Sequence, residues 1–196
     1  NKINLQAGEQ LRVEDLLGGL LSLSAAVTAY VLANNFPGGL GAFVVAMNEK
    51  AKELNLVDSQ FFNPAGLDEA NQLSSARDLN ILARELLKND FLRELVATPY
   101  LKINSTTTNN DNQAISSHQL FNTNQLLGTL GGVKRVKTGT TDLAGQVLVT
   151  LIERNGREIL VSLINSQDRY ADTQKLLALI FNTYQFISPE ESLLDI

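Results

Sequence analysis

The sequence predicts an α+β fold in which helices pack on an antiparallel sheet. Apolar residues recur at helical spacing through the first half of the chain, over 13–24, 40–54 and 79–87. The second half instead carries two β-rich segments, 145–153 and 158–164, joined through Asn155-Gly156, a dipeptide that favours a type I′ hairpin turn. Because helical segments come first and strands follow, the order favours helices gathered on one antiparallel sheet.

The helices of the first half are predicted from spacing and capping residues. The stripe of the first helix consists of Val13, Leu16, Leu17, Leu20, Leu21 and Ser24. After a break at Pro37-Gly38-Gly39, the stripe of the second consists of Leu40, Phe43, Val44, Met47, Ala51 and Leu54. Ser74 or Ser75 can cap a third helix, and Asp90 can cap a short fourth.

The remaining segments are a polar stretch and a final helix. Residues 104–117 are rich in Thr and Asn and are predicted to form an exposed loop or a weak hairpin. The single histidine, His118, is predicted to be a surface loop residue. The final amphipathic helix is expected to carry Leu176, Leu177, Ile180, Phe181 and Tyr184.

Composition excludes several classes of function. The 196 residues have an ordinary apolar content of 44% and a net charge of −5, and no basic cluster exceeds Lys134-Arg135-Val136-Lys137. Nucleic-acid binding is therefore not expected. With no cysteine and one histidine, disulfides, thiolate metal sites and His-rich metal sites are excluded, and neither a metal nor a cofactor is predicted.

One short motif points to chemistry, and its usual companion is absent. Lys137-Thr138-Gly139 is followed by an apolar run, so it is predicted to open a strand that lines a site. Such a triplet is one of three elements of penicillin-interacting serine enzymes, beside S-x-x-K and S-x-N. No Ser or Thr stands three residues before any of the eight lysines, so the nucleophile motif is not in these 196 residues.

An ordered series of segments resembles the serine D-alanyl-D-alanine carboxypeptidases, the low-molecular-mass penicillin-binding proteins. The resemblance runs from about Leu5 to Phe186. Besides the triplet in Val136–Gly145, it is carried by Ala7–Leu17, Met47–Leu54, Phe62–Asp68, Ser75–Leu79 and Asn122–Leu127. It implies a transpeptidase/β-lactamase-like domain over residues 1–187, followed by a C-terminal tail over 188–196.

The resemblance also implies that the domain is N-terminally incomplete, because the family's S-x-x-K serine lies upstream of the segment that opens here. The second motif is altered. Ser24 takes the serine position of the family's Ser-Gly-Asn-Asp segment, while Ala26 replaces the asparagine and Val27 the aspartate. Ala65 stands where the family often has histidine. A small residue at a helix contact is an equal interpretation of Ser24.

In the family a serine attacks the carbonyl of the penultimate D-alanine of a peptidoglycan stem peptide, and water then hydrolyses the acyl-enzyme. By resemblance, Lys137 is the second lysine of the site and Ser24 relays protons between the lysines and the leaving amine. The nucleophile serine and base lysine themselves are not in this chain.

The resemblance implies four substrate-binding residues. Thr138 donates its hydroxyl to the substrate carboxylate, and Gly139 lets the substrate backbone lie close to the strand. The Thr140 backbone N–H forms half of the oxyanion hole. Arg169 matches a family position near the carboxylate.

Three hypotheses follow. The intact protein is a D-Ala-D-Ala carboxypeptidase, it is a non-catalytic relative that binds stem peptides or a partner protein, or the chain is a folded fragment without activity. The altered Ala26 favours the second. Expected partners are a stem peptide ending in D-Ala-D-Ala, β-lactams only when the missing segment is restored, and a completing chain or second copy at an open sheet edge. The resemblance implies an extracytoplasmic location, in the bacterial periplasm or cell-wall space.

Overall fold

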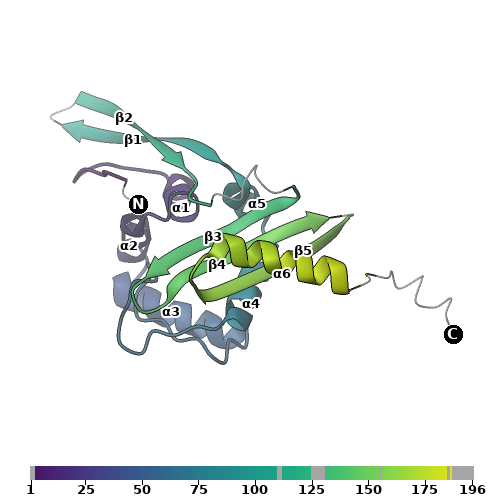
Figure 1. The fold of residues 1–196 in the computed structure, drawn as a ribbon. Helices are drawn as coiled ribbons and strands as arrows, with labels where there is room; N and C mark the ends of the chain where they lie inside the picture. The colour runs from purple at the N-terminus through teal and green to yellow at the C-terminus, as the bar shows by residue number, and fades with distance from the viewer. Residues whose placement is uncertain (1–2, 110–111, 125–130, 155, 185, 187–196) are drawn as a thin grey trace.

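The computed structural model describes residues 3–109, 112–124, 131–154, 156–184 and 186. Within these residues, five helices come first, then five strands, then a final helix (Figure 1). The strands form a two-stranded sheet of β1 and β2 and a three-stranded antiparallel sheet in the order β3-β4-β5. The predicted α+β class is confirmed. The predicted tail over 188–196 lies outside the described residues, so the boundary at residue 187 stays a prediction.

The first helical stripe ends earlier than its spacing predicts. Helix α1 spans Val13–Leu21 and α2 spans Ala26–Asn34, so Ser24 lies in the connection and not on a helix. Its φ of 59° is in the left-handed region that non-glycine residues seldom occupy. The prediction of a helix through Ser24 is therefore wrong, and a tight turn places the serine.

The other helices follow the sequence closely. Helix α3 spans Gly39–Glu53, α4 spans Ala76–Leu86 and α5 spans Asp90–Ala97. Ser75 caps α4 by accepting from the Asp78 N–H at 3.2 Å. The cap of α5 is Asn89, one residue before the predicted Asp90, and its side chain accepts from the Leu92 N–H at 3.1 Å.

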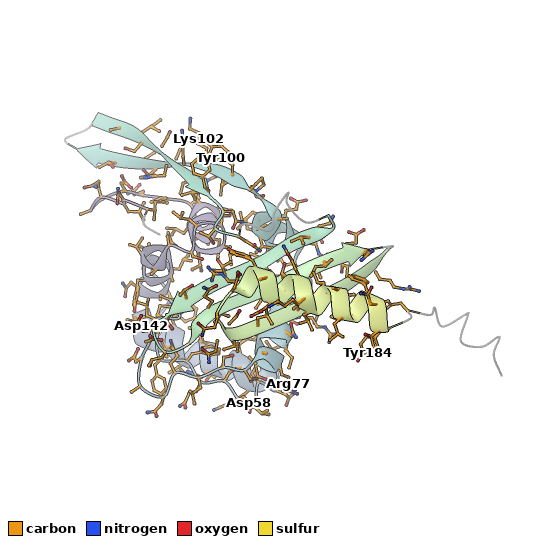
Figure 2. All side chains as sticks on the ribbon, viewed as in Figure 1. Asp58, Arg77, Tyr100, Lys102, Asp142 and Tyr184 are labelled. Carbon is orange, nitrogen blue, oxygen red and sulfur yellow. The ribbon has the colours of Figure 1, made fainter. Side chains whose placement is uncertain are left out.

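The polar stretch forms a long hairpin. Strand β1 (Tyr100–Asn109) pairs with β2 (Asn112–Phe121) in unbroken register, from Tyr100 opposite Phe121 to Asn109 opposite Asn112. Figure 2 shows the labelled Tyr100 and Lys102 on this hairpin. His118 is a strand residue whose Nε2 lies 3.3 Å from the buried carboxylate of Glu9. The prediction of a surface loop histidine is wrong, because the hairpin face that carries His118 packs on the N-terminal segment.

The main sheet begins before the predicted strand start. Strand β3 spans Val133–Thr141, β4 spans Gly145–Arg154 and β5 spans Arg157–Ser166. Lys137 therefore lies within β3, just after a bulge between Arg135 and Lys137. The predicted β4–β5 hairpin is present, although Asn155 of its turn lies outside the described residues. Figure 2 places the labelled Asp142 where β3 turns into β4.

Helices cover both faces of this sheet. Helix α6 (Arg169–Thr183) crosses one face, and α4 and α5 lie behind the other (Figure 1). The two faces give two cores, since alternate strand residues point to opposite sides. The α6 face is lined by Val133, Leu148, Ile152, Val161 and Leu177. The opposite face is lined by Ala83, Leu87, Val96, Val136, Val149 and Leu151.

Two further features bear on location and assembly. Within the described residues no single helix is long and apolar enough to cross a membrane, and α2 with α3 meets that test only as a pair bent by 102°. The outer edge of β5 has no strand partner in the part of the chain that the structure describes.

Candidate active site

The turn between α1 and α2 meets the middle of β3. The ammonium of Lys137 donates hydrogen bonds to Ser24 Oγ and to the carbonyl oxygen of Thr138, the latter at 2.6 Å. The hydroxyl of Ser24 in turn lies 3.5 Å from the Thr138 carbonyl oxygen. A lysine carries three N–H donors, so this pattern leaves one for a ligand. Residues 113 positions apart in the chain are thus joined at one point.

The environment of Lys137 weakens its hold on a proton. Burial, together with the positive charge of Arg169, lowers the pKa of its ammonium from 10.5 to about 8. At neutral pH most of the lysine is still charged. Two cations therefore face the same strand segment, and among the described ion pairs neither Lys137 nor Arg169 has a carboxylate partner.

Arg169 lies across the end of the triplet. Its Nη1 donates to the carbonyl oxygen of Gly139 at 2.6 Å, to Thr140 Oγ1 at 3.0 Å and to the carbonyl oxygen of Val147 at 3.3 Å. Its Nε is buried and has no hydrogen-bond acceptor among the described residues. A guanidinium whose described hydrogen bonds all go to neutral oxygens keeps its full charge for an anion.

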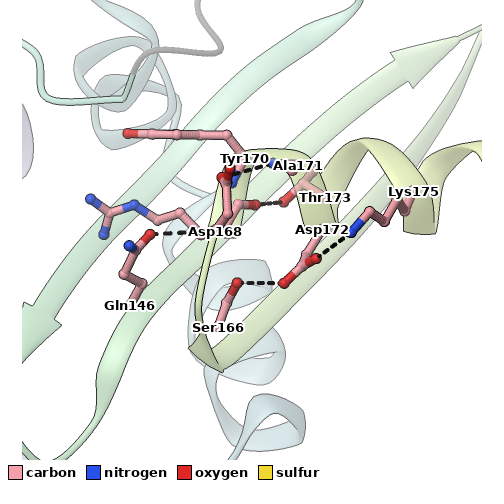
Figure 3. Close-up of polar contacts among 9 residues, drawn as sticks. Gln146, Ser166, Asp168, Tyr170, Ala171, Asp172, Thr173 and Lys175 are labelled. Atoms are coloured by element: carbon pink, nitrogen blue, oxygen red, sulfur yellow. Dashed lines mark hydrogen bonds and ion pairs between the residues drawn. The ribbon is translucent and has the colours of Figure 1, made fainter.

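Hydrogen bonds at the N-terminus of α6 hold the backbone of Arg169 in place. Asp168 caps the helix by accepting from the N–H groups of Tyr170 and Ala171 at 3.1 and 3.0 Å. Gln146 on β4 accepts from the Arg169 backbone N–H at 3.3 Å. Figure 3 shows these contacts beside a second set, in which Ser166 at the end of β5 and Lys175 on α6 both donate to the carboxylate of Asp172. The backbone of Arg169 is therefore held from both its helix and the sheet.

Thr138 and Gly139 have contrasting surroundings. Thr138 is 7% exposed, and its hydroxyl lies 2.6 Å from that of Thr123, with either able to donate. Gly139 is exposed, and a Cβ placed there would meet only Val147 Cβ, at 3.8 Å. The fold itself therefore has room for a side chain at Gly139, so the open strand surface there is available to a ligand.

The loop segment 63–68 contacts the turn at the C-terminal end of β3. Asp68 accepts from the Leu143 N–H at 3.1 Å in the β3–β4 turn. The Thr141 hydroxyl and the N–H groups of Leu143 and Asp142 lower the pKa of this carboxyl. Asn63 organises the loop behind it by accepting from the N–H groups of Ala65 and Leu67 at 3.1 Å. The segment 63–68 thus anchors the turn that follows Thr140.

The structure brings together the predicted residues Ser24, Lys137, Thr138, Gly139, Thr140 and Arg169 around one stretch of β3. Ala26 is the first residue of α2, two positions after Ser24, and its methyl group offers no hydrogen bond. Sequence reasoning missed Thr123 and Tyr170. The signal was there, since Thr123 lies in the family-like segment 122–127, but nothing local says which side chain it meets.

Comparison with known proteins places this fold and site. Residues 1–168 match the profile of the D-alanyl-D-alanine carboxypeptidase family. An α+β domain with Lys-Thr-Gly on a strand facing a serine is the architecture of penicillin-interacting serine enzymes. The chain belongs to the D-alanyl-D-alanine carboxypeptidase family of serine hydrolases.

Comparison with individual relatives gives the same family. The chain is 32% identical to the D-alanyl-D-alanine carboxypeptidase DacF of Bacillus subtilis (strain 168), over 94% of this chain and 46% of the relative. It is 27% identical to the D-alanyl-D-alanine carboxypeptidase of Streptomyces sp. (strain K15), over 90% and 63%. The crystal structure of the Streptomyces K15 DD-transpeptidase superposes with a TM-score of 0.86 at 28% identity, covering 92% of this chain and 72% of that one. The chain spans about half the length of the curated relatives it matches.

Proposed function

We propose that the whole protein is a D-Ala-D-Ala carboxypeptidase and that this domain binds the C-terminal carboxylate of a peptidoglycan stem peptide. The observation that carries the proposal is the pair of cations, Lys137 and Arg169, that flank Thr138–Thr140 without an acidic partner among the described residues. Unpaired charges in a partly buried place are costly, so an anion there is favoured.

The proposed roles follow from the contacts. The Thr138 hydroxyl and the free N–H of Lys137 donate to the substrate carboxylate, and Arg169 adds a second positive charge. Gly139 leaves room for the peptide backbone beside β3. The Thr140 N–H serves as one oxyanion donor, a contribution of about 3 kcal/mol in such sites.

The reaction needs a nucleophile that these 196 residues do not contain as a Ser-x-x-Lys pair. In the whole protein, a serine Oγ forms a bond to the penultimate D-Ala carbonyl carbon while its proton passes to a lysine. The C–N bond then breaks, and the terminal D-Ala leaves as an amine protonated through Ser24 and Lys137. Water hydrolyses the acyl-serine. β-Lactams acylate only that complete site, which acts in the periplasm or cell-wall space.

A second candidate is a non-catalytic binder of stem peptides or of a partner protein that adds a strand to the open β5 edge. Ala26 is the observation that favours it, because its methyl group cannot make the hydrogen bond to a substrate amide that the family's asparagine makes. As binders of stem peptides, both candidates use the same carboxylate site and differ only in acylation.

The shared site is tested by NMR titration of the 196-residue chain with a stem-peptide mimic ending in D-Ala-D-Ala and with its L,L counterpart. A charge-assisted hydrogen bond contributes about 1.5–3 kcal/mol, so affinity in the millimolar range, about −4 kcal/mol, is expected for the D,D-peptide. Shifts should centre on β3 and vanish in Lys137→Ala. Equal shifts for both peptides, or unchanged binding in Lys137→Ala, would leave only a folded fragment without this site.

A further inference from the structure

Thr123 connects three of the elements that surround the site. Its N–H donates to the carbonyl oxygen of Ser22, at the end of α1, at 3.3 Å. Its carbonyl oxygen accepts from the Tyr170 hydroxyl, in the first turn of α6, at 3.3 Å. Its own hydroxyl lies 2.6 Å from that of Thr138 on β3. The residue therefore touches the Ser24 turn, the triplet strand and the Arg169 helix at once.

The segment that carries Thr123 is itself held in place. Asn122 donates from its backbone N–H to the Pro99 carbonyl oxygen at 3.0 Å, and from its side chain to the Thr98 carbonyl oxygen at 3.1 Å. Both contacts lie at the base of the β1–β2 hairpin. A hydroxyl on a pinned backbone has a fixed position, which an exposed threonine on a free loop would not have.

The direction of the Thr123–Thr138 hydrogen bond decides whether the Thr138 hydroxyl presents a proton or a lone pair to a ligand. Each hydroxyl has one proton and two lone pairs. If Thr138 donates to Thr123, it turns a lone pair toward the site and repels an anion. If Thr123 donates to Thr138, the Thr138 proton is free for the site and is polarised by the bond behind it.

We propose that Thr123 is a positioning residue that makes the Thr138 hydroxyl a donor, so that the site selects a free C-terminal carboxylate over a carboxamide. This inference rests on the proposed carboxylate site. A bound carboxylate accepts from Thr138 and thereby fixes the order Thr123 to Thr138 to ligand. A neutral amide oxygen is a weaker acceptor and gains less from that order.

The test compares two peptides on five proteins of the full 196-residue chain. The peptides are the D,D-stem mimic and the same peptide with a C-terminal carboxamide. The proteins are the wild type, Thr123→Val, Thr123→Ser, Thr138→Val and the double variant that combines Thr123→Val with Thr138→Val. Valine keeps the shape of threonine without the hydroxyl, and serine restores the hydroxyl. Dissociation constants come from NMR titration, and the amide fingerprint spectrum verifies folding.

Thr123→Val is expected to weaken carboxylate binding about fivefold, the size of one net hydrogen bond, and to leave carboxamide binding unchanged. Thr123→Ser should restore the carboxylate affinity. Adding Thr123→Val to Thr138→Val should have no further effect, which a merely structural role of Thr123 would not produce. Should Thr123→Val not fold, Thr123→Ala provides the same comparison.

The outcomes separate two failures. If the wild type binds the carboxylate peptide and Thr123→Val binds it equally well, the positioning role of Thr123 is refuted while the proposed function stands. Equal losses for both peptides also refute it, because they mean a general disturbance of the site. If the wild type binds neither peptide, the proposed carboxylate site is wrong, and the positioning role of Thr123 is refuted with it.

Discussion

At the residue scale, Lys137 is a partly buried cation whose contacts are with neutral oxygens. Its burial lowers the pKa to about 8, and its contacts to Ser24 and Thr138 use neutral oxygens. Since the unfolded chain holds this proton up to about 10.5, the lowered pKa costs stability at neutral pH, and the cost disappears as pH rises from about 8 to 10.5. A partly buried cation kept at such a cost is a sign of function.

Carboxylate binding should therefore depend on pH. We expect affinity for the D,D-peptide to fall as pH rises through about 8, because Lys137 loses its charge there while Arg169 keeps its own. A bound anion raises the lysine pKa, so binding above pH 8 should take up protons. Calorimetry in buffers of different ionisation enthalpy measures this uptake. Lys137→Met should bind weakly with no step near that pH. A step that persists in Lys137→Met would assign it to another group.

Gly139 offers a substitution that separates folding from binding. A Cβ at this position meets only Val147 at an ordinary distance, and alanine costs less chain entropy than glycine in a strand. Gly139→Ala should therefore raise the free energy of unfolding by about 0.5–1 kcal/mol, measured by urea denaturation, while abolishing D,D-peptide binding. The matched control is Gly41→Ala on α3, which also has open space around its Cβ. It should stabilise the chain without changing affinity. Normal peptide binding by Gly139→Ala would show that the ligand does not lie against this strand.

At the element scale, the N-terminal segment is fastened to the β1–β2 hairpin. Gln10 and Thr106 exchange backbone hydrogen bonds of 2.8 and 3.0 Å. Beside them, His118 Nε2 lies 3.3 Å from the buried Glu9 carboxylate and 3.2 Å from the hydroxyl of the fully buried Ser105. The segment leads directly into α1, so the hairpin orients the helix that ends at the Ser24 turn.

Removing this histidine should destabilise the chain without touching the site. His118→Ala leaves the buried Ser105 hydroxyl without its hydrogen-bond partner and removes the imidazole that lies beside the Glu9 carboxylate, which should lower the free energy of unfolding by about 1–3 kcal/mol in urea denaturation. His118→Gln keeps a donor and should lose less. Affinity for the D,D-peptide should be unchanged in both at a temperature where they are folded. A loss of affinity in folded His118→Ala would instead couple the hairpin to the site.

The same elements show how far sequence reasoning reached. Helices α3, α4 and α6 and the β4–β5 hairpin have strong local periodicity, caps or turn residues, and they were predictable. The end of α1 was not, because residues 22–25 contain no glycine or proline. The left-handed Ser24 is stabilised by Lys137, 113 residues away. Likewise, the partner of His118 could not be known before the hairpin register placed that strand against Glu9.

The site residues also fall into two groups, those that the sequence indicates and those that only the fold brings to the site. Lys137, Thr138 and Gly139 form a contiguous motif, and Ser24, Thr140 and Arg169 could be added by resemblance to a family. Thr123 and Asp68 act through long-range contacts, Thr123 to Ser22, Thr138 and Tyr170, and Asp68 to the β3–β4 turn. Neither carries a chemical signature of its own in the sequence. Residues that position others are therefore visible only when the fold brings their partners to them.

At the scale of the whole molecule, the proposed carboxylate site on β3 has no Ser-x-x-Lys pair beside it within these 196 residues. Ser24 lies against Lys137, yet the hydrogen bond between them runs from the lysine ammonium to the serine hydroxyl oxygen. A lysine with a pKa of about 8 is mostly protonated at neutral pH, and in that form it has no lone pair to accept the serine proton. The Ser24–Lys137 pair is thus suited to pass a proton to a leaving group, not to start an attack.

The 196-residue chain should accordingly form no covalent adduct with a penicillin. Acylation requires a serine whose proton is taken up as the Oγ attacks, and no serine here has a lysine one helical turn later. Intact-mass spectrometry after incubation at neutral pH should show the unmodified mass, while a penicillin-reactive serine enzyme treated in parallel gains one penicilloyl group. Ser24→Ala is the matched control. A stoichiometric mass increase that disappears in Ser24→Ala would make Ser24 the nucleophile and overturn the division of labour proposed for this site.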